Sequence, residues 1–231
     1  MILGRMIFLN TDSNVAYLDE ATTATVTIAT KIAPVSMKAL SPCYELVIAT
    51  PGNHQFVEAC EFSRVQYDKH FSCDLNQFYP SMFCLYKDGV LVACCGFRSA
   101  RDEPLFLEQY LDEAIEEAIQ GQSDQVLRRH EIVEIGGLAV ASRHEGLAFM
   151  VRLAPQFQDL GFTYATCTVT SPVRKCLGEL GITSICLAAA NPQRVSPQDN
   201  DWGRYYELDP VVLAGPIQPA INHMAPFLAL I

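Results

Sequence analysis

Asp88-Gly89 constrains the fold of this chain more than any other pair of residues. The pair lies between two β-type segments, residues 81–86 and 90–97. Asp-Gly between such segments is the strongest short-range signal of a β-hairpin, because both central residues of the tight turn need a positive φ angle. The sheet of this protein must therefore contain antiparallel strands.

Residues 162–190 predict a second part of the sheet. Residues 162–170 and 182–190 are β-type, and the helix expected between them is capped by Ser171 and has Pro172 in its first turn. A strand–helix–strand unit normally connects parallel strands. We therefore predict an α/β (α+β) fold with a mixed central sheet flanked by helices on both faces.

Turn signals and hydrophobic periodicity place the remaining elements. The predicted strands are residues 44–50, 105–111 and 131–140, and the predicted helices are residues 54–67, 112–120 and 147–160. Pro155 should kink or divide the last helix. Residues 1–43 are expected to be an N-terminal extension with an extended arm or strand at 21–30, and residues 44–231 a single domain.

Charge and cysteine content exclude several classes of function. The chain has 231 residues, a net charge of −10 and no basic run, so it should repel phosphate backbones and not bind nucleic acid. Its nine cysteines are odd in number and contain no Cys-x-x-Cys pair, which favours reduced thiols over a disulfide framework. No metal site is expected, because thiols and imidazoles do not converge at short spacings.

The apolar segments of the chain do not predict a membrane anchor. The N-terminus lacks the basic start and long apolar core of a signal peptide. Residues 211–231 are apolar, but they follow Pro210 and contain Pro216, Pro219 and Pro226, and prolines at this density interrupt a spanning helix. We therefore expect a cytoplasmic protein without a transmembrane segment, and the sequence leaves monomer and homodimer open.

Residues 131–161 contain the best candidate for a ligand site. Gly136-Gly137 interrupts the predicted strand, which indicates a bulge or a close backbone approach. A polar loop then leads into a helix, whose free N–H groups favour an anion such as the phosphates of an acyl carrier. The predicted donor site comprises the strand backbone at Leu138, Ala139 and Val140 and the loop residues Ser142, Arg143, His144, Glu145 and Gly146. Considered by itself, a polar loop before a helix more often has no ligand-binding role.

The order of the predicted elements from residue 44 to 170 is that of GNAT-type acyltransferases, and several segments resemble the thermostable hemolysin family. The resemblance covers residues 44–215 and is carried by Phe78-Tyr79-Pro80, by residues 104–111 (PLFLEQYL), by residues 132–139 (IVEIGGLA), by Trp202-Gly203-Arg204-Tyr205-Tyr206, and by Asp209-Pro210 followed by Ala214-Gly215. Position 137 departs from the family pattern, which more often has Asn there.

The resemblance implies a GNAT-like fold related to the autoinducer synthases, which make N-acyl homoserine lactones. In those synthases a comparable strand carries a Glu followed by Ser-Arg-Phe. Glu134 stands in the matching place, but Gly136-Gly137-Leu138 replaces the Ser-Arg-Phe, which speaks against an acyl-homoserine-lactone product. The implied activity is an N-acyltransferase that moves an acyl group, fatty acyl by expectation, from acyl-CoA or an acyl-carrier protein to an amine or amino acid.

Acylation of an amine needs a base, donors for the oxyanion and an acid for the thiolate. Glu134 interrupts an apolar strand and is the best candidate base, since burial would raise its pKa. Glu108, predicted on the same strand face as Tyr110, could position the acceptor, and Tyr205 or Tyr206 could supply the acid. Each also has a structural interpretation, as an ion pair, an exposed strand residue or a packed aromatic.

Two groups of residues are weaker candidates. The five histidines are scattered, and a nucleophilic Cys94 or Cys95 is disfavoured because no basic group lies nearby; one of these adjacent thiols is expected in the core and the other partly exposed. Arg98, Arg101, Arg143 and Arg174 are candidates for docking a carrier protein.

Two other functions remain open at this stage. One is a membrane-active protein, as the family name suggests, although the sequence shows no basic amphipathic helix. The other is a non-catalytic protein that binds an acyl carrier.

Overall fold

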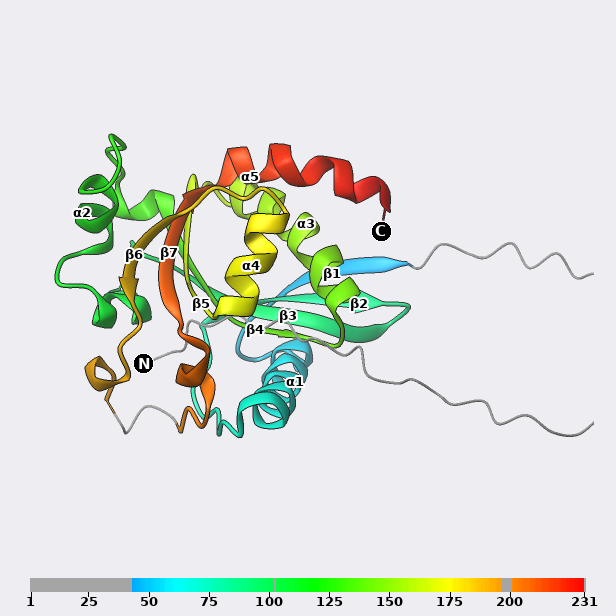
Figure 1. Ribbon diagram of the computed structural model, residues 1–231. Coiled ribbons are helices and arrows are strands. Elements are labelled where there is room, and N and C mark those ends of the chain that lie inside the picture. The colour runs from blue at the N-terminus through cyan, green and yellow to red at the C-terminus, as the bar shows by residue number, and fades with distance from the viewer. Residues whose placement is uncertain (1–42, 102, 197–200, 231) are drawn as a thin grey trace, which may run out of the picture.

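A computed structural model describes residues 43–101, 103–196 and 201–230 (Figure 1). The extension predicted at residues 1–43, with its arm at 21–30, lies outside these ranges except for Cys43. It therefore stays a prediction.

The centre of the molecule is a seven-stranded mixed sheet with strand order β1-β2-β3-β4-β5-β7-β6. The strands are β1 (Tyr44–Ala49), β2 (Ser81–Lys87), β3 (Val90–Ser99), β4 (Ile132–Val140), β5 (Tyr164–Val169), β6 (Ile185–Ala189) and β7 (Val211–Pro216). Neighbouring strands are antiparallel except β4 and β5, which are parallel. The predicted mixed sheet is confirmed.

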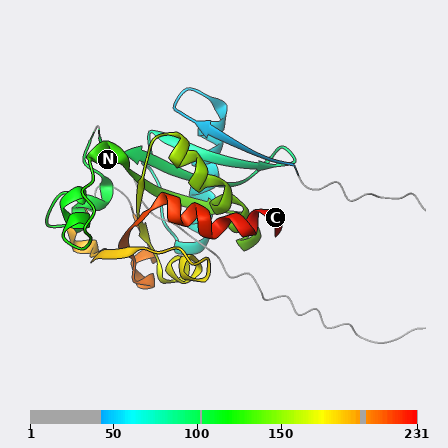
Figure 2. The ribbon, with the colours of Figure 1, turned by 90° about the horizontal axis from the view of Figure 1, so that it is seen from above.

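Helices cover both faces of the sheet, as predicted. They are α1 (His54–Phe71), α2 (Ile115–Gln120), α3 (Arg143–Asp159), α4 (Ser171–Glu179) and α5 (Ile217–Met224). Figure 1 shows α1 on one face and α3, α4 and α5 on the other. Seen from above in Figure 2, α5 lies beside α3. We call these the α1 face and the α3 face.

Each face of the sheet has its own core, because side chains alternate along a strand. On the α3 face the rings of Phe83, Phe97 and Phe157 pack with centroids 4.9 to 5.4 Å apart. On the α1 face Phe106, Trp202 and Tyr205 join a second cluster, with 6.1 Å between the Phe106 and Trp202 centroids and 5.8 Å between those of Trp202 and Tyr205. The β4 and β5 strands contribute to both cores and so hold the two halves together.

The hairpin at Asp88-Gly89 is confirmed. Asp88 has φ 51° and Gly89 has φ 81°, the two positive angles that a tight two-residue hairpin requires. Strands β2 and β3 pair on either side of it. The strongest local signal in the sequence thus fixed the antiparallel half of the sheet.

The predicted strand at 105–111 is wrong: this segment contains a 3-10 helix, η1 (Phe106–Tyr110). The N–H groups at its start donate to carboxylate oxygens and not to the carbonyl groups of a neighbouring strand. The Leu105 N–H donates to Glu108 at 2.6 Å, and the Phe106 N–H donates to Glu134 at 2.9 Å. These contacts override the β propensity of the residues.

Smaller differences concern the helices. Helix α3 begins at Arg143, four residues before the predicted start, and continues through Pro155 without dividing. Thr170, not Ser171, is the cap of α4, since the Ser171 hydroxyl donates to the Leu208 carbonyl at 3.0 Å. The predicted helix at 112–120 is shortened to Ile115–Gln120.

Candidate active site

Strands β4 and β5 separate part-way along their length. Their pairing runs from Ile132 opposite Tyr164 to Ile135 opposite Cys167 and ends there. Strand β4 continues to Val140, and this second half pairs with β3 on its other side. Among the described strands, none pairs with the β5 side of residues 136–140. Its backbone N–H and C=O groups are therefore available to an extended ligand.

A bulge lies where the two strands separate. Gly96 of β3 is opposite Gly136 and Cys94 is opposite Ala139, so two residues of β4 face one of β3. Gly137 has φ 59°, a left-handed conformation that favours glycine. The bulge expected from the paired glycines is confirmed, and it turns β4 away from β5.

The candidate donor residues follow directly along the chain. The side chains of Leu138, Ala139 and Val140 are buried, so these residues can present only their backbone to a donor. Ser142 caps α3, with its hydroxyl accepting the Glu145 N–H at 3.3 Å. The end of the open strand segment thus leads into the positive end of a 17-residue helix.

Two side chains of the predicted phosphate loop are oriented by neighbouring elements. Arg143 pairs with Glu179 of α4 at 2.9 Å, and both side chains are well exposed. Glu145 turns away from the helix axis toward Lys87 Nζ at 2.7 Å and the Tyr44 hydroxyl at 2.8 Å. Burial alone would raise the pKa of Glu145, but Lys87 and Tyr44 outweigh it and hold the pKa below its usual range. Gly146 is buried, while His144 is exposed.

Glu134 lies on the α1 face of β4, one residue before the strands separate. Its side chain is fully buried, and its two oxygens accept the N–H groups of Phe106 and Leu107 at 2.9 and 3.0 Å. Burial raises the pKa of Glu134 to about 7, against the lowering effects of Arg98, these two N–H groups and Tyr79. The carboxylate therefore holds the start of η1 and also has the pKa of a base that works near neutrality.

Arg98, on the neighbouring strand β3, is buried beside Glu134. Its Nε lies 3.6 Å from Glu134 Oε2, and its Nη1 lies 3.1 Å from Glu103. Nη2 of Arg98 has no hydrogen-bond partner among the described residues. Buried donors without partners are rare in folded proteins, so a polar group of a ligand or a water is expected here. The sequence indicated Arg98 only as a docking residue, and its burial excludes that role.

Gly96 makes room for this arrangement. A Cβ added at Gly96 would lie 2.2 to 2.5 Å from carbon atoms of Tyr79. The Tyr79 ring instead packs directly on β3, with the Arg98 guanidinium 5.1 Å from its centroid. The pairing of Gly96 with Tyr79 could not be predicted from the sequence, because no local pattern links a strand glycine to a tyrosine 17 residues earlier.

Glu108 is held in place by η1 and α2. Its oxygens accept the N–H groups of Leu105 and Ile115, and Arg129 binds it at 2.7 and 3.1 Å. Burial raises the pKa of Glu108, but Arg129 and the two N–H groups outweigh this effect and lower it. Four donors fix the carboxylate between these elements, which favours its structural interpretation. Its role with the acceptor stays a prediction.

Tyr205 and Tyr206 belong to the 3-10 helix η4 (Tyr205–Leu208). Tyr205 is fully buried, and its hydroxyl lies 3.5 Å from the Thr168 carbonyl. Tyr206 is half-buried, and its hydroxyl lies 3.0 Å from that of Tyr110. Of the two, Tyr206 is the more accessible candidate for an acid.

The adjacent thiols Cys94 and Cys95 are both fully buried, so the expectation that one is partly exposed is wrong. Strand β3 has neighbours on both sides and both of its faces are covered. Burial raises the pKa of both thiols, which opposes nucleophilic catalysis. Among the described residues, no three His, Cys, Asp or Glu side chains are grouped to hold a metal ion.

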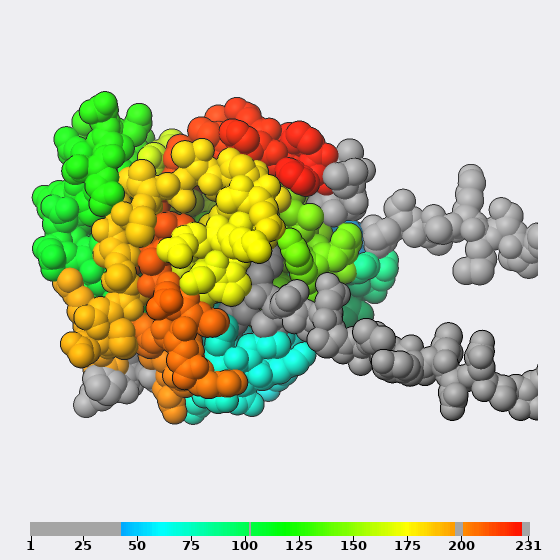
Figure 3. All heavy atoms as spheres, in the orientation of Figure 1, coloured from blue at the N-terminus to red at the C-terminus, as the bar shows by residue number. Residues whose placement is uncertain are grey.

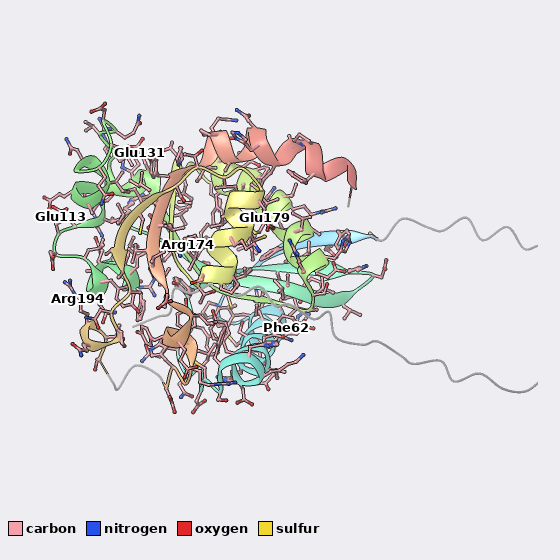
Figure 4. The ribbon with its side chains drawn as sticks, viewed as in Figure 1. Phe62, Glu113, Glu131, Arg174, Glu179 and Arg194 are labelled. Carbon is pink, nitrogen blue, oxygen red and sulfur yellow. The ribbon has the colours of Figure 1, made fainter. Side chains whose placement is uncertain are left out.

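An apolar cavity lies on the α3 face at the same point of the sheet. Its volume is about 110 Å³, and it lies between strands β4, β5 and β7 and helices α3, α4 and α5. Ile135 and Cys167, the last paired residues of β4 and β5, both line it. On this side of the molecule α4 covers the middle of the surface (Figure 3), and it carries Arg174 and Glu179 (Figure 4).

The family of the chain is decided by a match to the family model for thermostable hemolysin, which covers residues 49–221. The chain belongs to the thermostable hemolysin family. The segments that suggested this resemblance all lie within the matched residues. No curated protein matches the sequence.

Three solved structures illustrate the fold of this family member. An N-acyl amino acid synthase, FeeM, from uncultured soil microbes superposes with a TM-score of 0.53 at 13% identity, covering 79% of this chain and 96% of FeeM. The AHL synthase LasI gives 0.52 at 13% identity, covering 78% and 94%. A CoA-dependent acyl-homoserine lactone synthase, BjaI, solved with SAM and isopentyl-CoA, gives 0.51 at 10%, covering 81% and 90%. The fold is thus GNAT-like, as predicted.

Within the described part of the chain, no helix is both long and apolar enough to cross a bilayer.

Proposed function

We propose that this protein is an N-acyltransferase, which moves an acyl group from the thioester of acyl-CoA or an acyl-carrier protein to an amine or amino acid. The observation that carries the proposal is the separation of β4 from β5 after Ile135, with an open strand edge leading into the start of α3. An extended pantetheine arm can hydrogen-bond to that edge as an added strand would. Carrier phosphates then reach the N–H groups of Arg143 and His144.

The two sides of this opening suit the two substrates. The α1 face offers Glu134, with a pKa of about 7, and the unsatisfied donor of Arg98. The α3 face offers an apolar cavity. The amine acceptor is therefore assigned to the α1 face and the thioester to the opening itself.

The reaction follows from this placement. The acceptor nitrogen attacks the thioester carbonyl, a C–N bond forms, and the C–S bond breaks to release the thiolate. The proton lost by the nitrogen passes to Glu134, directly or through one water. The thiolate takes up a proton from an acid, for which the accessible Tyr206 is the candidate, so that amide and thiol are the products.

Mass-spectrometric detection of amide product tests the proposal. The protein is incubated with acyl-CoAs and acyl-carrier proteins and a panel of amines and amino acids. Glu134→Gln is expected to lower kcat/KM by about 10²- to 10⁴-fold, the usual contribution of a general base. Glu113→Gln, an exposed carboxylate near α2 (Figure 4), is the matched control and should keep full activity.

The two alternatives give different outcomes. A non-catalytic binder would hold the donor without forming amide in either the wild type or the variants. A membrane-active protein, which the family name suggests, would lyse red cells promptly when added without any acyl donor. Prompt lysis together with no donor binding would overturn the acyltransferase proposal.

A further inference from the structure

The central strands contain three side chains that are less buried than their position in the sheet predicts. Ile135 of β4 and Ala165 and Cys167 of β5 are half-buried, although these strands have neighbours on both sides and a helix layer covers their face. All three line the apolar cavity on the α3 face. The packing is therefore incomplete where the two strands begin to separate, although protein interiors are normally close-packed.

The lining of the cavity indicates the chemistry of its occupant. Apart from Thr183 and Ser184, the residues around it have apolar or small side chains, and they include Met150 and Met224. The cavity is partly open to solvent, and an apolar group that enters it removes apolar surface from water. Methionine side chains adapt to irregular apolar ligands. A phosphate, an amine or an amino acid head group would lose its hydrogen bonds here.

We infer that this cavity is the subsite for the acyl chain of the donor and that α5 sets the length of chain it accepts. The inference rests on the proposed acyltransferase function. A thioester carbonyl in the opening after Ile135 has Glu134 on one side of the sheet and the cavity on the other, because successive strand residues point to opposite faces. Ala220 and Met224 of α5 form part of the wall away from the strands.

The volume gives the expected length. A cavity of ~150 Å³ in another protein holds one benzene ring. By that measure, about 110 Å³ holds roughly four carbon atoms. Affinity should therefore rise about fourfold for each added methylene, the value for full burial, and level off once the cavity is filled. A longer chain has to extend beyond the residues that line the cavity.

Acyl-pantetheines test this inference, since pantetheine is common to CoA and carrier proteins. Calorimetric affinities are measured for free pantetheine and for butyryl, hexanoyl, octanoyl and dodecanoyl forms. Ala220→Phe, which adds bulk inside the cavity, should move the plateau to shorter chains and weaken octanoyl binding by about tenfold. Met224→Ala, which enlarges the cavity, should move it to longer chains. Asn222→Phe, an exposed position of the same helix, is the control.

The outcomes separate this inference from the proposed function. Opposite shifts by the two α5 variants, with folding verified by circular dichroism, would support it. Acyl-pantetheine affinity that is independent of chain length, or equal in both variants and the wild type, would overturn the inference and leave the acyltransferase proposal standing. No binding of pantetheine or of any acyl form would sink both.

Discussion

At the scale of single residues, Glu134 carries the most specific prediction about activity. Its raised pKa of about 7 means that the carboxylate is the active, proton-accepting form above neutrality. We expect kcat/KM to rise with pH and level off above about pH 7, and we expect Glu134→Gln to remove that limb of the profile. A pH–rate profile of both proteins checks this. An unchanged limb in the variant would assign the titration to another group.

The same residue makes a prediction about stability. Its pKa is about 7 in the folded protein against an ordinary value of 4.5, so folding takes up a proton between these values. The stability that Glu134 contributes is therefore fully present below pH 4.5 and is lost as the pH rises through 7. Urea unfolding at pH 5 and pH 8 should show wild-type stability falling relative to Glu134→Gln. The exposed Glu45→Gln controls for removal of a charge, and a difference that grows in the opposite direction would contradict the shift.

At the scale of elements, Gly96 links β3 to the segment before β2. A methyl group there would lie 2.2 Å from the Tyr79 ring, so Gly96→Ala should lower the free energy of unfolding by about 1–3 kcal/mol, the usual cost of overpacking. Gly178→Ala in α4 is the control, since its added methyl meets nothing within 4 Å and alanine favours a helix. Equal effects in chemical denaturation would show that Tyr79 moves aside freely.

Glu108 gives a second element-scale prediction, because it fastens η1 to α2. Glu108→Gln weakens the contact with Arg129 but keeps the shape of the side chain. We expect a loss of about 1–3 kcal/mol in unfolding free energy, the cost of a weakened charged hydrogen bond, with kcat near that of the wild type. A large fall in kcat without a loss of stability would restore the role with the acceptor that the sequence suggested.

At the scale of the whole molecule, the sequence predicts the structures that depend on adjacent residues, but it does not predict those that depend on contacts between residues far apart in the chain. Asp88-Gly89 specifies its hairpin through its own φ angles, and Gly136-Gly137 predicts the bulge. Residues 105–111 are β-type in composition, yet η1 forms because Glu134, 28 residues from Phe106, accepts its N–H groups. The insertion of β7 between β5 and β6 and the apolar cavity depend on tertiary packing, which no local pattern encodes.

The opening between β4 and β5 joins both faces of the sheet, and this makes donor binding a property of the whole molecule. Acyl-CoA should engage the start of α3 through its phosphates and the cavity through its acyl chain. Of these two parts of the site, CoA engages only the start of α3, and acyl-pantetheine engages only the cavity. At 100 times its dissociation constant, a ligand adds about 2.7 kcal/mol to stability, which corresponds to a rise in Tm of about 5–10 °C for a domain of this size. At equal concentration we therefore expect acyl-CoA to raise Tm more than either fragment in differential scanning fluorimetry, and Ala220→Phe to reduce the shift with acyl-CoA toward that with CoA. Equal shifts with acyl-CoA and acyl-pantetheine would show that the loop at 142–146 holds no phosphate, and would limit the donor site to the open edge of β4 and the cavity behind it.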